Sequence, residues 1–158
     1  MKKLVATTLA AVLALCLIGC ASMTKEEYCN NASVEYLTSG KYTDDVTDLL
    51  YSLPLYEDGD IDYKAYGNLT EHCENIIDLT GYPDDFKEAH EDLVKGANSI
   101  LSQVDIMVEA AACMKLYHET GDDSFMDEAV ELLEALSVMT EQAGNYILDA
   151  LHSMQANL

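Results

Sequence analysis

The stretch FKEAHEDLVKGANSILSQVDIMVEAAACMKLYH, residues 86–118, places apolar or weakly polar side chains at alternating steps of four and three residues. Such steps return to one face of an α-helix, because the helix has 3.6 residues per turn. The spacing predicts a single long helix with one continuous seam that faces a partner helix. The seam positions are Phe86, His90, Leu93, Ala97, Ile100, Val104, Met107, Ala111, Met114 and His118.

The partner helix follows directly in the chain. After the turn sequence ETGDDS, residues 119–124, the same spacing resumes, and Ser124 and Asp127 are available to cap this second helix. We therefore predict a long antiparallel hairpin in which positions whose residue numbers sum to about 242 face each other. The second seam consists of Phe125, Ala129, Leu132, Leu136, Met139, Ala143, Tyr146, Ala150 and Ser153.

The apolar stripe of this hairpin is wider than two helices can bury between them, because positions beside the seam, such as Val94 and Val130, are also apolar. In the N-terminal half the sequence pattern predicts three shorter helices, at about residues 25–38, 43–53 and 62–79. These helices can cover the apolar stripe. The sequence therefore predicts an all-α fold. We expect a helical bundle built on a long antiparallel two-helix hairpin, with the shorter N-terminal helices packed across it.

The first residues of the chain have the proportions of a secretory signal. Two lysines precede an apolar run from Leu4 to Ile18 that only two threonines interrupt. A membrane-spanning helix needs about 20 apolar residues, so this run is too short for a stable span.

The end of the run, Leu17-Ile18-Gly19-Cys20, resembles the lipobox of bacterial lipoproteins. The resemblance implies that residues 1–19 are a signal peptide and that Cys20 becomes the N-terminus, with a diacylglyceryl group on its thiol and an N-acyl chain. Residues 20–24 then form a lipidated tether, and residues 25–158 form one acidic helical domain. Several acyl chains anchor durably, since each buried methylene contributes about 0.8 kcal/mol. The alternative is an ordinary cleaved signal with an incidental cysteine.

The resemblance also implies a location on the extracytoplasmic face of the cell membrane or of an outer membrane. Ala21 follows the cysteine, where many Gram-negative lipoproteins of the inner membrane have aspartate, so an outer membrane is favoured in a source with two membranes.

The charge of the chain excludes whole classes of partner. Without residues 1–19 the chain keeps six lysines against 29 acidic residues, which gives −23, and it has no arginine. Nucleic acid is excluded, because phosphate backbones require clustered basic side chains. The acidic surface also repels anionic lipid headgroups, so the lipid anchor alone holds the protein at the membrane. The negative electrostatic field favours binding of basic proteins, basic peptides and divalent ions. The alternative is that the negative charge only keeps the protein soluble.

Of the five cysteines, three remain available in the exported domain, because Cys16 is removed with the signal peptide and Cys20 carries the lipid. An exported domain can keep disulfides, and an odd number leaves at least one thiol free. If a disulfide forms, Cys29 and Cys73 are the expected pair, since each lies on an apolar face in the first half of the domain. The alternative is three free thiols that pack as small apolar side chains.

Two groups of residues are candidates for a cation. Asp58, Asp60 and Asp62 have the spacing of the first ligands of a calcium loop, but Tyr63 and Leu69 stand where that loop needs glycine and glutamate. A weak surface site and a solvated acidic loop both remain open.

The second group is at the open end of the hairpin, where the predicted register sets His90 opposite His152. Glu91 and Asp149 are close by in the sequence, so two imidazoles and two carboxylates could hold zinc or copper. The alternative is a set of polar residues that finishes the end of a bundle.

No sequence motif indicates an enzyme: the chain has no G-x-S-x-G, no H-E-x-x-H and no glycine-rich phosphate loop. Eight of the ten tyrosines lie between Tyr28 and Tyr82. Tyrosines beside carboxylates suit recognition of basic peptides or sugars, although tyrosines also fill small helical cores. The sequence thus predicts a non-enzymatic envelope lipoprotein, without a cofactor, that binds or scaffolds a protein or peptide partner. For this role we expect an exposed apolar or tyrosine-rich groove on the first three helices. The alternative is a divalent-cation binder or carrier.

Overall fold

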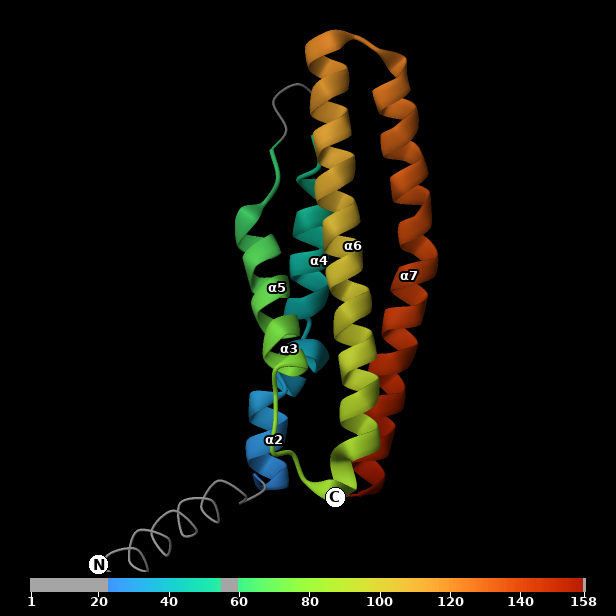
Figure 1. Ribbon diagram of the computed structural model, residues 1–158. Coiled ribbons are helices and arrows are strands. Elements are labelled where there is room, and N and C mark those ends of the chain that lie inside the picture. Colours follow the sequence, from blue (N-terminus) through green and yellow to red (C-terminus); the bar gives the residue numbers. More distant parts are fainter. Residues whose placement is uncertain (1–22, 55–59, 158) are drawn as a thin grey trace, which may run out of the picture.

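The computed structural model describes residues 23–54 and 60–157, and these residues form helices joined by short connections, without a strand (Figure 1). The predicted all-α fold is therefore confirmed. The elements are α2 (Lys25–Asn31), α3 (Val34–Thr38), α4 (Lys41–Tyr51), α5 (Tyr63–Ile77), the 3₁₀ turn η1 (Asp84–Phe86), α6 (Lys87–Thr120) and α7 (Asp123–Ala156).

Helices α6 and α7 have 34 residues each and lie side by side in opposite directions (Figure 1). Gln103 on α6 joins them, because its Nε2 donates to the Met139 carbonyl at 3.4 Å and its Oε1 accepts from the Thr140 hydroxyl at 2.8 Å. The residue numbers in these two pairs sum to 242 and 243, so the contacts follow the predicted register.

The turn between the two long helices is shorter than predicted. Gly121 ends α6 in the left-handed conformation, with φ 68°, and its N–H donates to the Tyr117 carbonyl. Asp122 then caps α7, because its side chain accepts a hydrogen bond from the Ser124 N–H at 3.0 Å. The cap expected at Ser124 or Asp127 is wrong, since the aspartate directly after the glycine already reaches the first free N–H groups.

After Ala143 the buried face of α7 shifts partly off the predicted seam, although Ala150 on that seam is still fully buried. Beyond this residue Ile147 and Met154 are buried, whereas Tyr146 on the predicted seam is 37 % exposed. Alternating steps of four and three average 3.5 residues per turn, so a straight helix drifts by about 20° per heptad relative to them. Over several heptads this drift moves the buried face to the next position.

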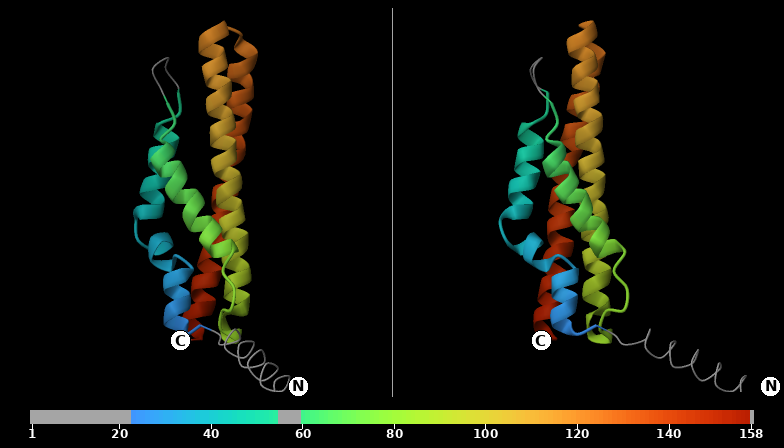
Figure 2. Two further views of the ribbon diagram at one scale, coloured as in Figure 1. Left: turned by 60° about the vertical axis from the view of Figure 1, so that its left-hand side comes forward. Right: turned by 90° about the vertical axis from the view of Figure 1, so that its left-hand side faces the viewer.

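The N-terminal helices form a second layer against the hairpin (Figure 2). The single helix predicted over residues 25–38 is two helices, because Ser33 has φ 53° and reverses the helical course between α2 and α3. Helix α5 packs directly on α6, α4 packs on α5, and α3 packs on α4. The turn end of the hairpin extends beyond this layer, and Val130 there is 47 % exposed, so the expected cover does not reach it.

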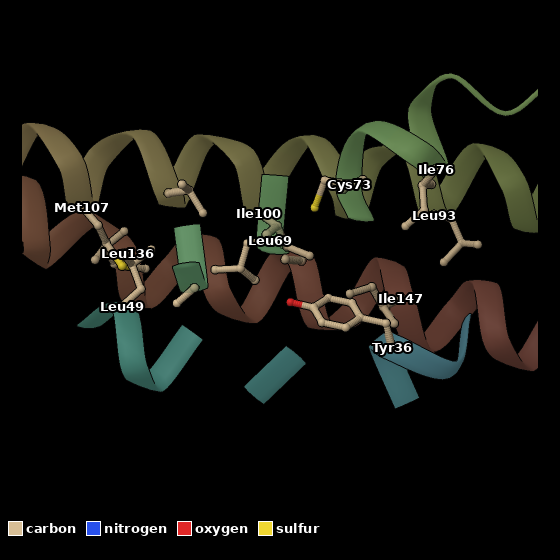
Figure 3. Packing of buried hydrophobic residues seen from close by; sticks show 14 of the residues in the cluster. Tyr36, Leu49, Leu69, Cys73, Ile76, Leu93, Ile100, Met107, Leu136 and Ile147 are labelled. Atoms are coloured by element: carbon tan, nitrogen blue, oxygen red, sulfur yellow. The ribbon is translucent and has the colours of Figure 1, made fainter. Parts of the chain in front are cut away.

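The hydrophobic core lies between the two layers (Figure 3). Leu49 from α4 and Leu69 from α5 are fully buried and point toward the hairpin, where Ile100, Met107 and Leu136 belong to the same cluster. Within the ranges that the structure describes, no helix combines the length and the apolar character needed to cross a bilayer.

Candidate functional site

Two open clefts on the N-terminal layer meet at His72 of α5, and together we call them the polar groove. The first, the amide cleft, has a volume of about 600 Å³ and lies between the α2–α3 segment and α5. The second, the tyrosine cleft, has a volume of about 260 Å³ and lies between α3, α4 and α5. The polar residues of the amide cleft are Asn30, Asn31, Ser33, His72, Asn75, Asp78 and Thr80. The tyrosine cleft is lined by Tyr36, Lys41, Asp44, Asp45, Asn68 and His72.

Ser33 stands at the break between α2 and α3, one residue after the C-terminal cap of α2. This is the position where helices commonly end on a left-handed residue, which is usually glycine. Ser33 adopts that conformation, and its hydroxyl oxygen lies 2.9 Å from Nδ1 of His72. The helix break therefore brings a hydroxyl and an imidazole from segments 39 residues apart into direct contact.

His72 is held from its other side by Tyr36. The two rings are stacked, with centroids 3.7 Å apart and planes inclined by 19°. Tyr36 in turn donates its hydroxyl hydrogen to Asp45 Oδ2 at 2.8 Å, and Asn68 Nδ2 donates to Asp45 Oδ1 at 3.1 Å. Burial, together with the hydrogen bond to Asp45, raises the pKa of Tyr36, so the phenol remains a donor. Contacts between three helices thus fix the centre of the groove.

The polar groove carries a surplus of negative charge. Its lining residues include three carboxylates, Asp44 and Asp45 in the tyrosine cleft and Asp78 in the amide cleft, against the single ammonium group of Lys41. In the described part of the chain the ion pairs are Lys25–Asp85, Lys95–Asp92 and Lys115–Asp60, so none of the groove carboxylates is in one. Unpaired carboxylates in a concave surface attract cationic groups more strongly than the same charges on a convex one.

The tyrosines do not line this groove as the sequence suggested. Tyr28 and Tyr36 are buried, and among the N-terminal tyrosines that the structure describes only Tyr36 contributes to a wall of the groove. Tyr51 and Tyr63 are 83 % and 65 % exposed, but they lie outside both clefts. The lining consists mainly of asparagine and aspartate, because the tyrosines of α2 and α3 fill the core.

The residues predicted to bind a transition metal do not come together. His90 is 6 % exposed, its Nδ1 lies 3.3 Å from the Tyr28 hydroxyl, and its ring centroid lies 4.1 Å from that of Tyr82. In contrast, Glu91, Asp149 and His152 are exposed. Within residues 23–54 and 60–157, no three His, Cys, Asp or Glu side chains are arranged to hold a metal ion. His90 instead belongs to an aromatic cluster that ties α2 to α6.

The predicted cation loop falls partly outside the described residues, where Asp58 lies. Asp60 pairs with Lys115 at 2.6 Å, and this hydrogen-bonded ammonium lowers the pKa of the carboxyl group. Asp62 caps α5, since its Oδ1 accepts from the N–H groups of Lys64 and Ala65. Both described carboxylates therefore already have protein partners.

The disulfide suggested for Cys29 and Cys73 is not formed, and Cys113 is free as well. The physical reason is that the two thiols have different surroundings. Cys29 is on α2, next to Tyr28, whereas Cys73 is on α5 and buried beside Tyr36. Burial raises the pKa of Cys73 to about 12, so this thiol stays protonated and unreactive. Cys20, the predicted lipid carrier, lies outside the described residues.

Comparisons with protein families, with curated proteins and with solved structures find no match to this chain. The geometry of the polar groove is therefore the basis for the functional argument.

Proposed function

We propose that this chain is a lipid-anchored protein of the bacterial cell envelope whose helical domain binds a basic segment of a protein or peptide partner. The observation that carries the proposal is the polar groove. Three carboxylates that form no ion pair with any described residue, and a series of amides, line its two joined clefts. A chain with formal charge −21 and no arginine adds a long-range field of the same sign.

The position of the groove suits a protein held at a membrane by its N-terminus. The Met23 N–H donates to the Gly81 carbonyl at 2.8 Å, so the chain enters the bundle at the end where α2 and the α5–α6 connection lie. Lys25 secures the same end, because it pairs with Asp85 at 3.3 Å and donates to the Asn157 carbonyl. A lipid on Cys20 would hold this end near the membrane and leave the hairpin turn farthest from it (Figure 1).

The chemistry of the groove favours an extended, basic and hydrophilic ligand. Asparagine amides can bind the polar groups of a peptide backbone, and Asp44, Asp45 and Asp78 can pair with lysine or arginine side chains. Both clefts are open along the surface, which suits an extended segment better than an enclosed small molecule. The predicted role in divalent-cation binding has no comparable support among the described residues.

The test is binding of a short fluorescein-labelled peptide of alternating lysine and serine to the full-length protein in detergent micelles. We expect fluorescence anisotropy to rise with protein concentration, and the affinity to fall as salt is added. The variant Asp44→Asn/Asp45→Asn/Asp78→Asn should bind about tenfold more weakly, since three charge contacts of a few tenths of a kcal/mol each approach 1.4 kcal/mol.

The matched control removes the same amount of charge elsewhere. Asp127→Asn/Glu131→Gln/Glu141→Gln neutralises three exposed carboxylates of α7 and should bind the peptide nearly as the natural chain does. Equal weakening by both triple variants would show that net charge alone attracts the peptide and would overturn the assignment of the groove.

A further inference from the structure

We propose that Ser33 and His72 form a nucleophile–base pair that hydrolyses a small carboxylic ester bound in the amide cleft. The proposal goes beyond the binding role, does not depend on it, and departs from the expectation that the protein is not an enzyme. It rests on three observations: the conformation of Ser33, the contact between the two side chains, and the free amides beside them.

The conformation of Ser33 favours a functional role for its hydroxyl group. With φ 53°, Ser33 is the one non-glycine residue in the left-handed region among the residues that the structure describes. Side chains other than glycine, asparagine and aspartate are disfavoured there, and such strain is concentrated at functional sites. Glycine would fit this helix end better, so what serine adds is the hydroxyl that reaches His72.

His72 is placed to act as the base. Its Nδ1 lies 2.9 Å from Ser33 Oγ, within the reach required for proton transfer. Stacking on Tyr36 fixes the plane of the imidazole, and Tyr36 is itself held by Asp45. In the tautomer with the proton on Nε2, Nδ1 accepts the hydroxyl hydrogen of Ser33. Both side chains line the amide cleft of about 600 Å³, so a small substrate can reach them.

Donors for a developing oxyanion are present in the same cleft. Asn30 and Asn75 line it, and neither side-chain amide has a hydrogen-bond partner within residues 23–54 and 60–157. Amide N–H groups stabilise the negative oxygen of a tetrahedral intermediate in acyl transfer. Within those ranges no carboxylate hydrogen-bonds to His72, so the imidazole lacks the acidic partner of a full triad. An ester, whose alcohol leaves more easily than an amine, is therefore the substrate class.

The reaction balances without a cofactor. Ser33 Oγ forms a bond to the ester carbonyl carbon as its proton moves to His72 Nδ1, which gives a tetrahedral oxyanion. The bond from that carbon to the alcohol oxygen breaks, and the alcohol takes the proton from Nδ1. A water molecule then attacks acyl-Ser33 with His72 again as the base, and its proton passes to Ser33 Oγ as the carboxylic acid leaves.

The experiment uses the full-length protein in detergent micelles with two probes, p-nitrophenyl acetate and a fluorophosphonate. We expect a burst of p-nitrophenol, and phosphonylation of Ser33 with loss of fluoride, located by fragmentation of the tryptic peptide 26–41. Ser33→Ala should abolish the label at this position, because it removes the nucleophile. His72→Asn should lower the labelling rate by about a hundredfold, the lower end of what a positioned general base contributes.

Two further variants separate chemistry from folding. Ser33→Gly removes the hydroxyl but relieves the backbone, so it should lose labelling without a loss of thermal stability. Ser39→Ala alters another serine of the same peptide, whose hydroxyl donates to the Tyr36 carbonyl, and it should keep the labelling. Absence of label on Ser33, or a labelling rate that His72→Asn leaves unchanged, would overturn the proposal. Either result would leave the peptide-binding test unaffected, because that test has its own readout.

Discussion

His90 shows how burial changes the role of a single residue in this protein. The sequence suggested it as a metal ligand at the open end of the hairpin, but the structure packs its ring against both Tyr28 and Tyr82, with Phe86 also packed against Tyr28. Burial lowers the pKa of His90, and the nearby charge of Glu91 opposes this effect to a smaller extent. The folded state therefore favours the neutral form of the His90 imidazole.

We predict that acidification destabilises the fold through His90. Below about pH 6.5 His90 is protonated in the unfolded chain, whereas burial opposes its protonation in the folded chain. The unfolded state therefore binds more protons and is favoured. The free energy of unfolding of the natural chain, relative to that of His90→Phe, should fall between about pH 7 and about pH 5. Urea unfolding at several pH values measures this difference.

The control for this prediction is His152→Phe, the same substitution at an exposed histidine of α7. It should leave the pH dependence of unfolding close to that of the natural chain. Parallel pH profiles for the natural chain and His90→Phe would contradict the prediction.

The α6–α7 hairpin is the element on which the rest of the bundle is built. Gln103 is buried at its middle, and its bonds to Met139 and Thr140 are satisfied only in one register. The two helices also approach closely at Gly96, where an added Cβ would lie 3.0 Å from Ile147 Cγ1. The polar contact and the close approach together define how the helices align.

We predict that Gly96→Ala destabilises the protein by about 1 kcal/mol. Alanine gains about 0.5–1 kcal/mol in a helix interior, but overpacking against Ile147 costs about 1–3 kcal/mol. In an Ile147→Ala background the same change should become stabilising, because the close contact is gone. A double-mutant cycle based on urea unfolding measures the coupling.

Gly67 and Gly144 provide the matched controls, since they also lie inside helices and an added Cβ at either would meet nothing within 4 Å. Alanine at each should stabilise the fold by about 0.5–1 kcal/mol. A stabilising Gly96→Ala in the natural background would show that α6 and α7 separate there without cost.

At the scale of the whole molecule, the two ends of the bundle differ in what surrounds them. At one end α2, η1 and the C-terminus of α7 are joined, with Lys25 paired to Asp85 and bonded to the Asn157 carbonyl. At the other end the hairpin turn extends beyond the short helices (Figure 2). A chain anchored at Cys20 would present the polar groove from the side of the bundle.

We predict that Cys20→Ala abolishes the lipid anchor. Without the thiol no diacylglyceryl group can be attached, so the chain should move to the soluble fraction or accumulate as the uncut precursor. Fractionation of bacteria fed with labelled palmitate measures both location and lipid. Cys16→Ala is the control, because Cys16 lies four residues before the lipobox cysteine. A Cys20→Ala chain that stays anchored and processed would show that the lipobox interpretation is wrong.

The sequence by itself determined the all-α fold, the antiparallel hairpin and its register. These features depend on apolar spacing within one segment, and Met139 and Thr140 meet Gln103 where that spacing predicts. The drift of α7 to Ile147 could have been found the same way, since it follows from 3.6 residues per turn. The lipid anchor at Cys20 stays a prediction.

Only the tertiary structure decided the candidate site. Ser33 contacts His72 because α2 ends at a left-handed residue and α5 packs alongside, and no local pattern links two residues 39 positions apart. The sequence predicted one continuous helix over residues 25–38, so it gave no sign that Ser33 ends a helix. Likewise, His90 faces Tyr28 rather than His152, because the side of α6 that a short helix covers depends on packing between segments distant in the chain. Periodicity specifies which face of a helix is buried, whereas the partner of each buried side chain is specified by the complete fold.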